Sequence, residues 1–118
     1  MRFSTNQHPF YCGIALQART LYVWIMKHAG EIMLHRHMKA APDLFRKAIT
    51  PDREGLVGAV EGICTWYWLA DLWAEEGMPF VLGHALSMQA LHGGKAKNDT
   101  SDSPKIAALL RGGLLPQA

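Results

Sequence analysis

The sequence is poor in cysteine and contains no long apolar run. Its two cysteines, Cys12 and Cys64, form neither a CxxC motif nor a disulfide framework, which is typical of a protein in a reducing compartment. No apolar stretch approaches the length of a membrane span, and the N-terminus lacks the apolar core of a signal peptide. We therefore expect a cytoplasmic protein without membrane contact.

A strong charge imbalance is also missing, because the formal net charge is only +2. The total charge thus does not indicate nucleic-acid binding, which only a local cluster of cations could support. Hydrophobic residues make up 49% of the 118 residues, which excludes a disordered tail and predicts one globular domain over residues 1–118, with a loose tail at 1–7. No Ser-His-Asp or Cys-His order is present, and the glycines before Lys95 do not fit a Walker phosphate loop.

The distribution of apolar residues predicts five strands and three helices. The first strand, Phe10–Leu16, is apolar on both faces, as expected in the middle of a covered sheet. The predicted strands span residues 10–16, 21–26, 32–38, 56–62 and 80–83, and the predicted helices span about 42–49, 66–76 and 104–111. The residues expected to face the core from the first helix are Leu44, Phe45, Ala48 and Ile49.

The order of these elements predicts the architecture. Three antiparallel strands come first and two strand–helix–strand crossovers follow, which places the fourth strand beside the first and parallel to it. The resulting α/β fold, a mixed five-stranded sheet with flanking helices, is the ribonuclease H-like (RuvC-like) plan. In this plan position 15 lies next to Glu61 at the end of the fourth strand, and the last helix can bring Asp99 and Asp102 to the same edge.

The segment Leu91–Leu110 contains a glycine pair, two lysines and two aspartates ahead of a helix. Together with Glu61, the carboxylates of Asp99 and Asp102 are hard oxygen ligands that suit Mg²⁺ near a phosphate. The same spacing also fits an ordinary helix start, because Asp, Ser and Pro favour the first turn. If Ser103 caps a helix that begins at Pro104, both aspartates lie on the preceding loop.

The segments FYCGIAL, VEGICTWYWLADLWAEEGMPFVLGHA and HGGKAKNDTSDSPKIAALLRGG resemble the N-terminal domain of DEDD transposases of the insertion-sequence-110 group. The resemblance extends over nearly the whole chain. It implies a RuvC-like domain in which one Asp, one Glu and two further Asp bind Mg²⁺ during DNA transposition and recombination by a mobile element. Matched to this sequence, the family's catalytic metal ligands fall on Glu61, Asp99 and Asp102.

The chain departs from the family pattern at Ala15. Where the family has Gly-Ile-Asp, this sequence has Gly13-Ile14-Ala15, and an alanine methyl cannot coordinate a metal. We therefore expect a degenerate site with weak or lost Mg²⁺ binding. The resemblance further implies a second domain with a nucleophilic serine, which has no counterpart before Ala118. A truncated transposase domain that is inactive alone is the resulting expectation.

Cations lie close to these acids in the sequence. His92, Lys95, Lys97 and Arg111 are predicted to contact the phosphate backbone of a nucleic acid, although a solvated basic loop has the same composition. The resemblance implies DNA, a guide RNA and other transposase protomers as partners. The alternative function is a non-catalytic nucleic-acid-binding or protein-interaction module derived from a transposase.

Aromatic residues cluster in the second predicted helix. Helical spacing predicts that Trp66 and Trp73 pack inside, with Tyr67 or Trp68 on the outer side, rather than all four stacking on bases. Separately, two histidines of the third strand, at positions 35 and 37, share one face, but no third soft ligand nearby in the sequence supports a zinc site.

Overall fold

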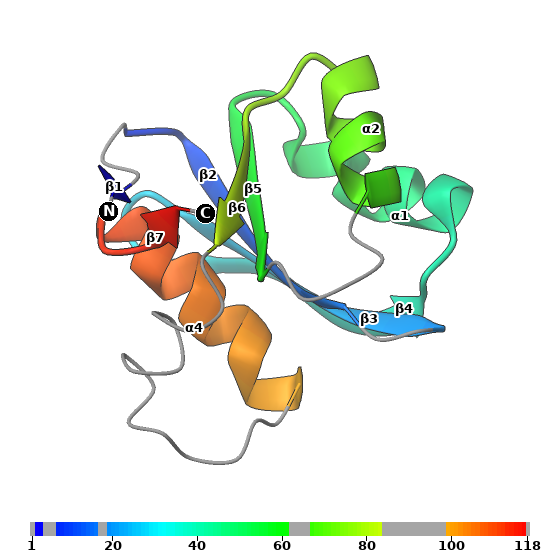
Figure 1. Cartoon of the computed structure of the whole chain (residues 1–118), viewed down its shortest axis with the longest axis horizontal. Coiled ribbons are helices and arrows are strands. Elements are labelled where there is room, and N and C mark those ends of the chain that lie inside the picture. The colour runs from blue at the N-terminus through cyan, green and yellow to red at the C-terminus, as the bar shows by residue number, and fades with distance from the viewer. Residues whose placement is uncertain (1, 4–6, 17–18, 62–66, 84–98, 118) are drawn as a thin grey trace.

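The computed structural model of the protein describes residues 2–3, 7–16, 19–61, 67–83 and 99–117 (Figure 1). Its elements in chain order are β1 (Arg2–Phe3), β2 (Phe10–Leu16), β3 (Thr20–Lys27), β4 (Ile32–Lys39), α1 (Pro42–Ile49), the 3-10 turn η1 (Thr50–Asp52), β5 (Leu56–Glu61), α2 (Tyr67–Glu75), β6 (Phe80–Gly83), α4 (Asp99–Arg111) and β7 (Pro116–Gln117). In the described part of the chain, no helix is long and apolar enough to cross a membrane.

One mixed sheet organises the molecule, with the strand order β1-β7-β6-β5-β2-β3-β4. β2 is antiparallel to β3 and parallel to β5, and β5 is parallel to β6. The five predicted strands therefore occupy the predicted positions, with the first strand and the fourth side by side at the centre. The two-residue strands β1 and β7 extend the sheet beyond β6, and the sequence analysis did not predict them.

Helices cover both faces of the sheet (Figure 1). On one face, α1 and α2 insert Phe45 and Trp73 into a buried apolar cluster with alternate residues of β2, β3 and β5. On the other face, Ile106 and Leu110 of α4 pack against Tyr11 and its neighbours. Because side chains alternate along a strand, the apolar runs of β2 and β5 supply both clusters, which explains their lack of polar residues.

The approach of Trp73 to the sheet depends on a glycine in β5. A Cβ atom at Gly58 would lie within 3.0 Å of three atoms of the Trp73 ring, so the bare backbone makes room for the indole. Trp73 is fully buried, as predicted, and it also contacts Phe45 and Phe80 with ring centroids 5.5 Å apart in each case. Trp68 is half-buried against Phe45, whereas the side chains of residues 66 and 67 lie outside the described residues.

Two predictions about helices are wrong. Leu44 is 47% exposed rather than part of the core, because the buried stripe of the short helix α1 consists of Phe45, Ala48 and Ile49, spaced i, i+3, i+4. The last helix begins at Asp99 rather than at Pro104, which lies inside α4. Pro104 is the sixth residue of α4, beyond the first four N–H groups that have no partner within a helix, so α4 lacks one backbone hydrogen bond at this position.

Candidate functional site

The rim of the sheet at the carboxyl ends of β2 and β5 is where the predicted site should form. The parallel register of these strands pairs Ile14 with Val60, so Ala15 and Glu61 are the next neighbours along them. Ala15 is also paired with Tyr22 across the antiparallel ladder. The predicted adjacency of position 15 and Glu61 is therefore present in the backbone.

α4 lies directly on β2 at Gly13. A Cβ atom there would come within 3.0 Å of the Ser103 carbonyl oxygen and the Ala107 nitrogen, so the helix backbone rests on the strand backbone. Gly13 and Ala15 are two residues apart and thus belong to the same face of β2. The helix consequently packs on the face of the sheet to which Ala15 belongs.

The direction of α4 follows from its last residue. The Arg111 Nε donates a hydrogen bond of 2.7 Å to the His28 carbonyl oxygen, and the His28 N–H donates to the Pro9 carbonyl at 3.0 Å, beside the start of β2. The C-terminus of α4 thus lies at the amino end of β2. Its N-terminus must point toward the carboxyl end of that strand.

The first turn of α4 therefore approaches the rim. Asp99 precedes Ser103 by four residues, about 6 Å along a helix, and Ala15 follows Gly13 by two residues, about 6.6 Å along a strand. Because Asp99 and Asp102 are three residues apart in one helix, they lie on neighbouring positions of its surface. The backbone of Glu61 thus lies beside Ala15 at the rim, and α4 packs on the same face of the sheet with its N-terminus directed toward that rim. That Asp99 and Asp102 reach Glu61 there stays a prediction. The side chains of these three acids lie outside the described residues.

Position 15 itself provides no ligand. Ala15 is 5% exposed, and its methyl group occupies the strand position where the family pattern has a carboxylate. Within the described residues, no group of three or more histidine, cysteine, aspartate or glutamate side chains is placed to hold a metal ion. The buried hydroxyl of Ser103 has no hydrogen-bond partner among the described residues. Ser103 lies inside α4 and does not cap it.

The predicted cations are not all brought together. Arg111 is twelve residues from Asp99, about 18 Å along the helix. Its guanidinium donates a hydrogen bond to the His28 carbonyl oxygen in the turn after β3. It is therefore not part of the rim, and its contact with nucleic acid stays a prediction. His92, Lys95 and Lys97 lie outside the described residues.

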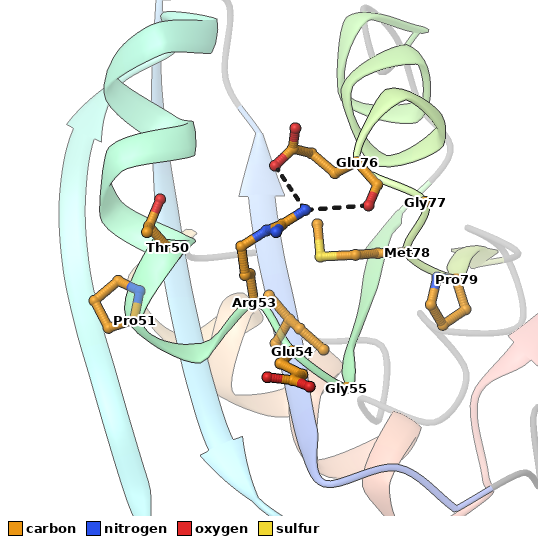
Figure 2. A pocket seen from close by; sticks show the side chains of 10 residues that line it. Thr50, Pro51, Arg53, Glu54, Gly55, Glu76, Gly77, Met78 and Pro79 are labelled. Carbon is orange, nitrogen blue, oxygen red and sulfur yellow. Dashed lines mark hydrogen bonds and ion pairs between the residues drawn. The ribbon is translucent and has the colours of Figure 1, made fainter.

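The structure also has a pocket, but it lies at the other end of the sheet (Figure 2). η1, the start of β5 and the segment between α2 and β6 form its walls. The Arg53 guanidinium binds the Glu76 carboxylate at 3.2 Å and the Glu76 carbonyl oxygen at 3.3 Å, which ties the end of α2 to the turn before β5. Because this pocket adjoins the amino end of β5, it is separate from the rim.

Two other candidate groups have structural roles. Burial raises the pKa of the Cys12 thiol far above its ordinary value, with a smaller contribution from the negative charge of Asp52, so Cys12 is not a nucleophile. The rings of His35 and His37 lie against Trp24 and Tyr22 respectively. No local pattern in the sequence predicts these two contacts, since they depend on the register between β3 and β4.

The strand order, the parallel pair at its centre and the helix across β2 define a ribonuclease H-like (RuvC-like) fold. Among solved structures, the chain is similar to T. thermophilus RuvC in complex with Holliday junction substrate, with a TM-score of 0.64 and 12% sequence identity. The likeness covers 94% of this chain and 100% of that chain, and it shows the fold. No family model and no curated relative matches the sequence.

Proposed function

We propose that residues 1–118 form the RuvC-like N-terminal domain of a DEDD transposase, which binds nucleic acid during DNA transposition and whose metal site is degenerate. The observation that carries this proposal is the parallel register that sets Glu61 beside Ala15 at one rim of the sheet, with α4 packed on the face to which Ala15 belongs. The resemblance of the sequence to these transposases supports the finer assignment. The RuvC-like fold supports the class of domain.

The residues of the rim fit a divalent metal only in part. Glu61, Asp99 and Asp102 are oxygen donors of the kind that Mg²⁺ prefers, and such an ion activates a phosphate toward attack when bound. The fourth position is Ala15, which has no donor atom. Because that position lies in the central strand, where a carboxylate can bridge two ions, the native set is incomplete and no catalytic step is derived from it.

Nucleic-acid binding depends less than metal binding does on the carboxylate that is missing at position 15. His92, Lys95 and Lys97 precede Asp99 by two to seven residues, so the sequence that leads into α4 carries positive charge just ahead of the predicted metal ligands. Lysine contacts to phosphates position a nucleic acid without reading its sequence. They weaken as the salt concentration rises, because the release of condensed counterions on binding is then less favourable. We therefore expect salt-dependent binding of DNA, with a guide RNA and other protomers as further partners.

A non-catalytic interaction module is the alternative, and the alanine at position 15 favours it over an active enzyme. Such a module would use the same basic segment without any metal. The two functions differ in their response to a restored carboxylate. That difference defines the experiment.

The test compares the native chain with two variants, Ala15→Asp and Ala15→Asn. The asparagine side chain has nearly the same shape as aspartate but no charge, so it serves as the control. Mn²⁺ or Mg²⁺ is titrated calorimetrically, and nicking of supercoiled DNA is followed in parallel. Tighter metal binding in Ala15→Asp alone supports a degenerate nuclease-type site. Equal indifference of all three proteins to metal contradicts the metal-site assignment and leaves the interaction module.

DNA binding is tested separately by gel shift. The Lys95→Ala/Lys97→Ala variant should weaken the shift at every DNA sequence and reduce its dependence on salt. Absence of any shift at low salt would remove the nucleic-acid assignment.

A further inference from the structure

Four rings form two cross-strand pairs on β3 and β4, and we call them the ring platform: Tyr22, Trp24, His35 and His37. The register pairs Tyr22 with His37 and Trp24 with His35. The Tyr22 and His37 rings are stacked, with centroids 4.1 Å apart and an interplanar angle of 9°. The Trp24 and His35 rings lie 4.6 Å apart at 56°.

The outer half of the platform is open to solvent. β4 is the edge strand of the sheet that the described residues form. His35 and His37 are exposed, and Tyr22 and Trp24 are half-buried. The other face of β4 is occupied, because Leu34 and Met38 pack against the α1–α2 side of the core. The two imidazole rings are therefore accessible to solvent in the described part of the chain.

We propose that the ring platform binds the unpaired bases of a single-stranded nucleic acid. Bases stack on aromatic side chains, including histidine, and such stacking tolerates any base sequence. A base on the outer face of His37 would extend the existing Tyr22–His37 stack by one ring. His35 is two residues away in the same strand, about 6.6 Å, and offers a second ring to a neighbouring base.

The surrounding charge favours a polyanion. Between residues 19 and 39 the basic side chains are Arg19, Lys27, Arg36 and Lys39, and the one acid of this range, Glu31, binds Lys27 at 3.2 Å. β4 itself contains no acid, and Lys39 belongs to the same face as both histidines. Arg19 lies beside the end of β4, where its carbonyl accepts the Ala40 N–H at 2.9 Å. Two copies paired edge to edge through β4 would repel one another.

The platform is continuous with the rim. One row across the sheet runs from Ala15 through Tyr22 to His37, and strands in a sheet are about 4.8 Å apart. His37 thus lies two strands, about 10 Å, from position 15. The inference therefore rests on the proposed function: the rim would hold one part of a nucleic acid, and the ring platform would bind its unpaired bases nearby.

Cross-strand ring pairs also stabilise sheets without binding anything, so the test must separate the two roles. Fluorescence anisotropy is measured with labelled oligo(dT) and oligo(rU) of about twelve nucleotides, and with a DNA duplex. The variants are His37→Ala, His37→Tyr and His37→Lys, and Met33→Ala serves as control on the same strand and face. Thermal unfolding of each variant reports its stability.

Stacking predicts a pattern that depends on the ring. His37→Ala should weaken single-strand binding at least about fivefold, the smallest effect expected for one stacked base. His37→Tyr should restore it, His37→Lys should not, and Met33→Ala should bind as the native chain does. Duplex binding should change little in all four. The oligo(dT) and oligo(rU) arms tell DNA from RNA, since only RNA has the 2′-hydroxyl.

Several outcomes would overturn the inference. Full binding by His37→Lys with loss in His37→Tyr would show that charge alone matters. Unchanged single-strand binding in His37→Ala, with loss in Lys95→Ala/Lys97→Ala, would reject the platform while the proposed function stands. No binding of any nucleic acid by the native chain would reject both. A concentration-dependent dimer disrupted by His37→Ala would assign the surface to a second copy of the chain.

Discussion

Gly13 of β2 and Ser103 of α4 touch through their backbones, because the strand has no side chain at the point where the helix crosses it. This contact sets the distance between the backbone of α4 and the backbone of β2. The position of α4 over β2 therefore depends on a residue that has no side chain of its own. Substitution at this glycine tests the packing on which the site depends.

Gly13→Ala should destabilise the protein by about 1–3 kcal/mol, the usual range for overpacking a tight core. The added methyl would collide with the backbone of Ser103 and Ala107, which cannot rotate away as a side chain does. Urea unfolding followed by circular dichroism measures the change. Gly77→Ala is the control, because a Cβ there meets nothing within 4 Å and only the positive φ of 70° opposes it. Native stability in Gly13→Ala would show that α4 does not rest on β2.

Two adjacent residues of α1 should respond in opposite ways. Phe45 is fully buried, so Phe45→Ala should cost about 3–5 kcal/mol of unfolding free energy. Leu44 is 47% exposed, so Leu44→Ala should stay within about 0.5 kcal/mol of the native value. Chemical denaturation of both variants decides the matter. Equal losses would mean that α1 is rotated relative to the structure described above.

Because its thiol is buried, Cys12 should make the free energy of unfolding fall as the pH rises into the alkaline range. The folded pKa of Cys12 is raised by burial, so above the unfolded thiol pKa, about 8.5, only the unfolded chain loses the proton. This contribution to stability is therefore complete below that pH and falls by up to about 1.4 kcal/mol per pH unit above it. Urea titrations of a Cys64→Ser background, with and without Cys12→Ala, isolate the effect. The slope should disappear with Cys12→Ala.

The same burial predicts slow chemical modification. In the Cys64→Ser background, Cys12 should react with a thiol reagent only as fast as the protein opens, and at once in denaturant. Rapid labelling of the folded protein at neutral pH would contradict the assigned position of Cys12 in the core.

The central strands could be predicted from the sequence because local pattern and global position agree there. β2 and β5 are apolar on both faces, which identifies the middle of a covered sheet, and connectivity rules then give their parallel pairing. The adjacency of Ala15 and Glu61 followed from that pairing.

Other features depended on contacts that no local pattern contains. α4 begins five residues before the predicted start, because proline is a typical first residue of a helix and Pro104 is instead the sixth residue of this one. The attachment of Arg111 to the His28 carbonyl joins segments that are 83 residues apart. The pairing of Tyr22 with His37 requires the exact register of β3 and β4, in which a shift of one residue would move each ring to the other face.

The most direct test of the rim is a crystal structure of Ala15→Asp grown with Mn²⁺, with the ion located by anomalous scattering. We expect manganese at the carboxyl ends of β2 and β5, bound by the introduced carboxylate together with Glu61, Asp99 and Asp102. Oxygen ligands about 2.2 Å from the ion would fit a divalent metal of this kind. Manganese bound elsewhere, or a rim in which Glu61 lies away from the first turn of α4, would contradict it.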